Sequence, residues 1–225
     1  MTPDVTDAAM QLANAPDSGS AVRLVIVLTA LAMLPGLLLA MTPFVRFVVV
    51  LSLLRQALGL QQAPPNQVLV GLSLLLTLLV MQPTVDAVRS TAFEPYMAGT
   101  LATEDALEAG LLPLRAHMMS QVSRNDLAAA MRIARMPTPD AWEDVSTTVL
   151  TTGYALTELR RAFSIALKVY LPFLVVDMVV SSILLGLGMM MLPPVVVSVP
   201  FKLLLFVLMD GWTLLVTGLA NSVHP

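Results

Sequence analysis

The chain has 225 residues, of which 57% are hydrophobic and only 12% are charged. Its mean hydropathy of +0.83 excludes an ordinary soluble domain, so lipid or a large protein partner must cover much of its surface. The net charge of −3 argues against nucleic-acid binding, and the absence of cysteine excludes disulfides, thiol catalysis and thiolate metal sites. Because His117 and His224 both lie outside the apolar runs, we expect neither a metal site nor a cofactor.

A polar, acidic tail over residues 1–21 opens the chain and lacks the positively charged start of a cleavable signal peptide. The first hydrophobic half follows over residues 22–82. Its long apolar run is about twice the ~20 residues that span a bilayer, but prolines break it at two places. The breaks predict two helices, over about 22–40 and 44–59.

The stretch "QQAPPNQ" follows these helices and contains Pro64 and Pro65. Because a proline disfavours helix in the residue before it, the pair predicts a structural turn rather than a contact site. A third, shorter apolar helix is expected over residues 68–81.

Residues 83–161 differ abruptly in composition, because ten acidic residues stand there against seven arginines. We interpret this insert as a water-facing helical domain on the periplasmic side of the membrane. Thr103 is a predicted N-cap, and Ser123 with Asp126 three residues later predicts a capping box. No strand-type alternation is long enough to predict a sheet.

The second hydrophobic half, 162–220, precedes a short C-terminal tail over 221–225. It predicts one helix over 162–192, interrupted early by Pro172, and another over 195–219 after the break at Pro193 and Pro194. The predicted fold is therefore an all-α membrane protein, in which proline-broken helical hairpins form two hydrophobic halves around a helical insert.

Six charged residues lie in or beside the apolar segments, where an ionised group in mid-membrane costs about 3 kcal/mol or more. Those near segment ends could reach the headgroups instead of pairing. For the two deeper aspartates we favour pairing with Arg or Lys, including one from a neighbouring copy. The six are Arg46, Arg55, Lys168, Asp177, Lys202 and Asp210.

Two other function classes fit less well. An intramembrane aspartyl protease would use Asp177 and Asp210, but no Gly-x-Gly-Asp motif precedes either one, so we expect no enzyme. A small-solute transporter or channel is a stronger rival, because proline-broken helices near charges build transporter sites. The two halves nevertheless share no visible repeat.

The run "LLGLGMMMLPPVVV" holds three consecutive methionines, Met189, Met190 and Met191. Successive residues turn by about 100° around a helix, so the three cannot form one packing stripe. The flanking residues Gly186, Gly188, Pro193 and Pro194 are hinges at which the chain can leave the helix. Composition alone favours core filling for this run.

The motifs "APPNQVL", "GMMMLPP" and "PFKLLLFV…DGW", together with the acidic helical insert, resemble the FliP family over about residues 22–220. FliP-like proteins are membrane components of the flagellar type III protein export gate, and they are closely similar to the SctR family of virulence injectisomes. The resemblance implies a pore in the inner membrane, at the flagellar basal body, through which unfolded proteins pass.

The implied partners are further copies of the chain in a homopentamer, FliQ-like and FliR-like proteins, FlhB-like and FlhA-like gate proteins, and membrane lipids. In the family the methionine run is likened to a gasket that closes the pore, which here implies Met189 to Met191. From the cost of unpaired charge in apolar surroundings, we predict ion pairs between subunits or within the chain for eight residues: Arg46, Arg55, Glu158, Arg160, Arg161, Asp177, Lys202 and Asp210. For the "TELRRAF" stretch, a solvated helix face is the alternative.

Overall fold

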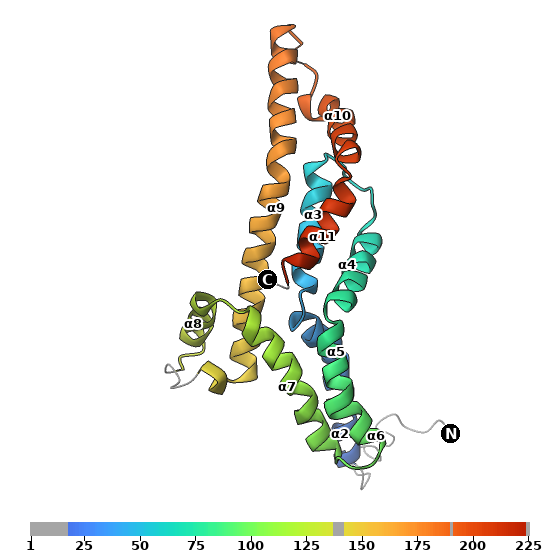
Figure 1. Cartoon of the computed structure of the whole chain (residues 1–225), viewed down its shortest axis with the longest axis vertical. Coiled ribbons are helices and arrows are strands. Elements are labelled where there is room, and N and C mark those ends of the chain that lie inside the picture. The colour runs from blue at the N-terminus through green and yellow to red at the C-terminus, as the bar shows by residue number, and fades with distance from the viewer. Residues whose placement is uncertain (1–17, 137–141, 190, 224–225) are drawn as a thin grey trace, which may run out of the picture. The chain divides into compact units, whose positions relative to one another are not determined.

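The computed structural model describes residues 18–136, 142–189 and 191–223 (Figure 1). Within these ranges every regular element is a helix and no strand occurs, which confirms the predicted all-α class for this part of the chain. The chain divides into two compact units, residues 1–39 and 40–225, which are described separately.

The first unit contains the helix α2 (Ser18–Ala40), in which Pro35 lies inside the helix. Large apolar side chains are exposed along its length, among them Val22, Met33 and Leu37. A helix that is apolar on all sides requires lipid or protein around it. The helix predicted over residues 22–40 is confirmed.

The second unit is arranged around α9 (Thr147–Gly186), a helix of 40 residues (Figure 1). It packs against α3 (Phe44–Ala57) and α10 (Pro194–Leu208), while α4 (Asn66–Val80) packs against α3, and α11 (Gly211–Asn221) contacts α10 and α4. Helices α3 and α4 of the first hydrophobic half therefore share one core with the second half rather than forming a separate core. Its buried side chains include Phe47, Leu51, Leu69, Ala162, Phe206 and Leu219.

The insert consists of a helical hairpin and one further helix. The outgoing arm is α5 (Gln82–Val88), a π-helical turn η1 (Arg89–Phe93) and α6 (Glu94–Met97). The returning arm is α7 (Thr103–Gln121), which packs along α5 and η1, whereas α8 (Arg124–Ile133) packs on the first turns of α9.

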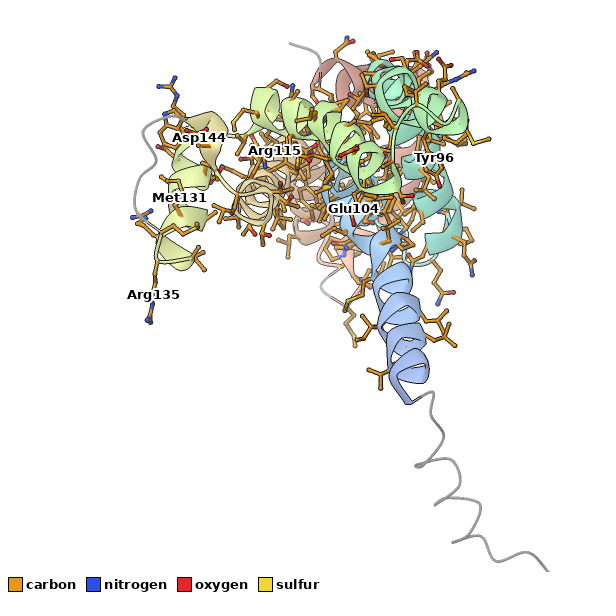
Figure 2. All side chains as sticks on the ribbon, turned by 90° about the horizontal axis from the view of Figure 1, so that it is seen from below. Tyr96, Glu104, Arg115, Met131, Arg135 and Asp144 are labelled. Carbon is orange, nitrogen blue, oxygen red and sulfur yellow. The ribbon has the colours of Figure 1, made fainter. Side chains whose placement is uncertain are left out.

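A second core holds the insert to α9, with buried residues that include Met118, Leu127, Leu150 and Tyr154. Seen from below, Met131 and Arg135 mark the α8 side of the insert, and Tyr96 and Glu104 mark the hairpin side (Figure 2). A 3-10 turn, η2 (Trp142–Asp144), precedes α9. The insert is thus tied to the end of α9 that lies farthest from the methionine run.

Three predicted local features are wrong in the described structure. Pro172 lies inside α9 and does not end it, and α9 also continues across residues 161 and 162 without a break. The single helix predicted over 195–219 is instead two, α10 and α11, because Asp210 takes a left-handed backbone with φ of 49°. Phe206 lies so close to Gly211 that any Cβ there would meet its ring.

The predicted helix caps are confirmed only in part. Thr103 is the first residue of α7, and Ala102 occupies the cap position. Ser123 does occupy the N-cap position of α8, but it makes no side-chain capping bond, and Asp126 is buried against α9 instead of bonding back to Ser123. The Asp126 carboxylate, which the local pattern assigned to a capping box, instead binds Thr157 and Arg160 on α9.

By length and hydropathy, α9 is the one described helix that could cross a membrane unaided. Three further candidates are pairs of helices bent at a short break: the end of α2 with α3, α4 with the arm that ends at Met97, and α10 with α11. The last two pairs are bent by 64° and 66°. The part of the chain that the structure describes therefore holds between one and four candidate spans.

Gly153 marks the closest approach of α8 to α9. A Cβ added there would lie 3.0 Å from the Leu127 Cα and 3.3 Å from its nitrogen, and backbone atoms cannot move aside alone. We expect Gly153→Ala to lower the free energy of unfolding by about 1–3 kcal/mol, measured by thermal denaturation in detergent. Gly71→Ala is the matched control, because a Cβ at Gly71 meets nothing within 4 Å and should stabilise α4 by about 0.5–1 kcal/mol. Equal melting temperatures for the two variants would contradict this packing.

Candidate functional site

A buried ion pair joins the two hydrophobic halves. Arg46 on α3 is completely buried, and its Nε donates to Glu158 Oε2 on α9 at 2.8 Å, while its Nη2 contacts Glu158 Oε1. Nη1 donates to the carbonyl oxygen and the hydroxyl of Ser222, just after α11, at 2.7 and 2.8 Å. The planar guanidinium thus satisfies three segments of the chain at once, which a lysine could not do.

The neighbouring residues on α9 extend this contact into the insert. Arg161 donates from Nη1 to Gln121 Oε1 on α7 at 2.7 Å and lies 4.0 Å from Glu158 Oε1. Gln121 in turn donates to the Val223 carbonyl oxygen at 2.7 Å. The "TELRRAF" stretch therefore connects the hydrophobic halves with the insert.

Arg160 points to the other side of α9 and binds Asp126 on α8, with 2.6 Å between Nη2 and Oδ1. The Thr157 hydroxyl donates to the second oxygen of Asp126 at 3.0 Å. Asp126 is 2% exposed, so these two partners replace the water it would otherwise bind.

A second buried cluster, which we call the α10 clamp, consists of Asp177, Ser198 and Lys202. Lys202 is 2% exposed, and its Nζ donates to Asp177 Oδ2 at 2.6 Å and to the Ala57 carbonyl oxygen at 2.9 Å. The Ser198 hydroxyl donates to the other Asp177 oxygen. The clamp thus fixes α10 to α9 and to the end of α3.

The Arg55 side chain binds the turn between α3 and α4, which contains Pro64 and Pro65. Arg55 Nη1 donates to the Pro64 carbonyl oxygen at 3.1 Å and to Asn66 Oδ1 at 2.7 Å. Pro65 occupies the cap position before α4. The geometry fits the structural turn predicted for Pro64 and Pro65.

Asp210 lies at the bend between α10 and α11 and is exposed. Within the described ranges it makes no ion pair. Asp177 is held by Lys202, so it cannot share a proton with Asp210 as a catalytic aspartate pair must. Four of the six charged residues in or beside the apolar segments therefore make contacts within the chain, namely Arg46, Arg55, Asp177 and Lys202.

The methionine loop, residues 187–193, connects α9 to α10. Gly188 has a φ of 73°, and the Met189 N–H donates to the Leu184 carbonyl oxygen, so the helix ends as glycine-capped helices do. The side chain of Met191 is 99% exposed and that of Met189 is 42% exposed. Met190 lies outside the described residues.

The predicted hinges of this loop differ in role. Gly186 is the last residue of α9 and keeps a helical position, so Gly188 alone supplies the left-handed turn. Pro193 caps α10 and Pro194 is its first residue, where a missing N–H costs nothing. An apolar loop with fully exposed methionine therefore stands at the tip of a helical hairpin.

Sequence reasoning missed the polar partners of the charges, which are Gln121, Asp126, Thr157, Ser198 and Ser222. One signal was available: Ser198 precedes Lys202 by four residues, so both lie on one face of α10. The others belong to segments far apart in the chain, and no spacing rule joins them.

The Arg46–Glu158 pair offers a test of this network. Arg46→Met should lower the free energy of unfolding by about 3–5 kcal/mol, because it leaves a buried carboxylate unpaired. The double variant with Glu158→Met should recover much of that loss. The exposed pair Arg89–Glu94 is the matched control, where the side chains are 69% and 57% exposed and Arg89→Met should cost about 1 kcal/mol or less. Equal losses for the two arginines, measured by thermal unfolding in detergent, would contradict the role of the buried pair.

Comparison with known proteins identifies the family of this chain. The FliP family matches residues 27–219. The flagellar biosynthetic protein FliP of Pectobacterium carotovorum subsp. carotovorum is 47% identical over 203 residues, which cover 90% of this chain and 79% of that protein. FliP of Bacillus subtilis (strain 168) is 43% identical over 203 residues, 90% of this chain and 92% of that protein. FliP of Caulobacter vibrioides is 44% identical over 201 residues, 89% of this chain and 76% of that protein. The chain therefore belongs to the FliP family.

Proposed function

We propose that several copies of this chain form the pore of the flagellar type III export gate and pass unfolded flagellar proteins across the bacterial inner membrane. Membership of the FliP family makes the chain a flagellar biosynthetic protein and part of the flagellar export apparatus. A membrane-length apolar helix supports a place in the inner membrane. The proposal goes further in two respects: the chain forms a pore, and unfolded flagellar proteins pass through it.

One observation carries the proposal: Met191 is 99% exposed at the tip of the α9–α10 hairpin. Exposure of an apolar side chain to water is unfavourable in free energy, so we expect neighbouring copies of the chain to cover Met191. Methionine is unbranched and adaptable, so a ring of such loops can close against small solutes and still yield to a passing polypeptide.

The α10 clamp gives this loop a rigid base. Lys202 and Asp177 fix α10 to α9 on the protein side of the loop, and Ala57 adds a contact to α3. Movement is therefore restricted to the residues beyond the clamp. A gate that opens only at its rim suits a pore that must remain sealed between substrates.

We further propose the five segments 1–21, 22–82, 83–161, 162–220 and 221–225 as the working division of the chain, with 83–161 on the periplasmic side. The acidic composition and the separate core of the insert support a water-facing place for it. In the assembly, a homopentamer would associate with FliQ-like, FliR-like, FlhB-like and FlhA-like proteins.

Two alternatives are less well supported. An injectisome pore of the SctR type would use the same geometry, but the relatives compared are all flagellar. A small-solute transporter would need hydrated charges near mid-membrane, whereas Asp177 is engaged by Lys202 and Ser198.

Replacement of Met189, Met190 and Met191 by glycine tests the gate. We expect a several-fold rise in the leakage of small dyes or ions in cells that produce the gate with its partners, because the loop loses the side chains that would fill the pore. The matched control is Met136→Gly, an exposed methionine of the insert outside any helix. Unchanged leakage at equal amounts of assembled gate would refute the gasket role.

A further inference from the structure

Of the six charged residues in or beside the apolar segments, Lys168 and Asp210 are the two whose side chains make neither an ion pair nor a hydrogen bond with the residues that the structure describes. Arg46 binds Glu158, Lys202 binds Asp177, and Arg55 binds the turn after α3. Lys168 and Asp210 make no ion pair with any residue that the structure describes. Lys168 carries a positive charge and Asp210 a negative charge.

Lys168 lies on the exposed side of α9, and the helix face that follows it toward the methionine loop is apolar. Leu171 follows one turn later and is 59% exposed, and Val175 follows another turn later and is 57% exposed. Beside it, Leu167 is 64% exposed. A single ammonium group in such a surface must find an anion, a headgroup or water once the surface is covered.

Asp210 lies in a similar setting at the bend between α10 and α11. Its neighbours Val207 and Leu208 are 71% and 75% exposed, and Trp212 is 42% exposed. The backbone at Asp210 is left-handed, which an asparagine or aspartate tolerates better than most residues. The bend therefore presents one carboxylate in the middle of an apolar surface.

The two charges lie at the same level of the molecule. A cavity of about 260 Å³ is lined on one side by Val169 and Pro172 of α9 and on the other by Met209 and Gly211 at the bend. Val169 adjoins Lys168 in the chain, Pro172 follows it one helical turn later, and Met209 and Gly211 flank Asp210. In a ring of copies whose axis runs along α9, rotation keeps this level, so the lysine of one copy and the aspartate of the next need no shift along the axis to meet.

We propose that Lys168 of one copy forms an ion pair with Asp210 of the adjacent copy, and that this pair sets the register between neighbouring subunits. The occupant of this face is therefore a second copy of the chain, selected by opposite charge within matching apolar surfaces. The inference rests on the proposed function, because it requires the copies to assemble.

A contact of this kind is heterologous, since two different surfaces meet at each interface. Each copy offers one lysine and one aspartate, so every copy in a closed ring uses both charges. Apolar side chains around the pair exclude water from it, which makes the wrong register costly because it leaves two charges unpaired.

Cysteine cross-linking tests the contact directly, because the chain has no cysteine of its own. Two variants of the chain, Lys168→Cys with one affinity tag and Asp210→Cys with a second tag, are produced in the same cells. The gate partners are produced with them, and the membranes are then oxidised. We expect a disulfide-linked dimer that carries both tags. Ser182→Cys replaces Lys168→Cys in the matched control, because Ser182 is also exposed on α9 but lies about 21 Å farther along it, beyond the reach of a disulfide.

Charge exchange gives a second, independent readout that does not depend on a cysteine at the bend. Lys168→Glu should lower the yield of assembled complex about tenfold or more by placing two carboxylates together, and Asp210→Lys in the same chain should restore it. Lys168→Met, which keeps the length and loses the charge, should have an intermediate effect.

The outcomes separate the contact from the function. Assembled complexes with no two-tag dimer, or with a link only inside one doubly substituted chain, would overturn the Lys168–Asp210 contact and leave the pore proposal in place. If the unsubstituted chain itself fails to assemble with its partners, the proposed function fails with it. A two-tag dimer together with rescue by charge exchange would establish the contact.

Discussion

Ionised side chains inside an apolar protein need partners, and this requirement organises the structure. Arg46 is the clearest case, because one buried guanidinium binds α3, α9 and the residues after α11 together. Removal of these bonds would leave a buried carboxylate and a free carbonyl oxygen at the centre of the chain. Within the second unit, the helices of the two hydrophobic halves therefore form one body around Arg46 rather than independent hairpins, and α9 connects this body with the insert.

The continuity of α9 has a mechanical consequence. Its 40 residues correspond to about 60 Å of helix, with the insert at one end and the methionine loop at the other. The two buried charge clusters lie along this helix, the first at Glu158 and the second at Asp177. The helix that joins the insert to the methionine loop is thus held to the other helices at two points along its length.

Much of the fold follows from local rules in the sequence. Pro43, Pro65 and Pro194 each lie just outside or at the start of a helix, where a proline is expected. Of the charged residues that the apolar runs single out, Arg46, Asp177 and Lys202 make ion pairs within the chain. Pro172 did not obey the same rule, because the tertiary contacts of a long packed helix outweigh one lost hydrogen bond.

The identity of the partners could not be predicted, for a physical reason. Arg46 and Glu158 are 112 residues apart, and Arg46 and Ser222 are 176 residues apart, so only the folded chain brings them together. The bend at Asp210 could not be predicted from the sequence either, because no proline marks it. At this bend the Phe206 ring lies against Gly211. Local patterns thus located the charges and most helix ends, while the pairings required the three-dimensional fold.

The central claim is that this chain works as one of several copies in a pore. The mass of the detergent-purified complex, measured intact after production with the neighbouring gate proteins, tests it most directly. The account predicts a mass equal to several copies of the 24.1 kDa chain plus its partners. A monomer or dimer, with the partners present but unbound, would contradict it.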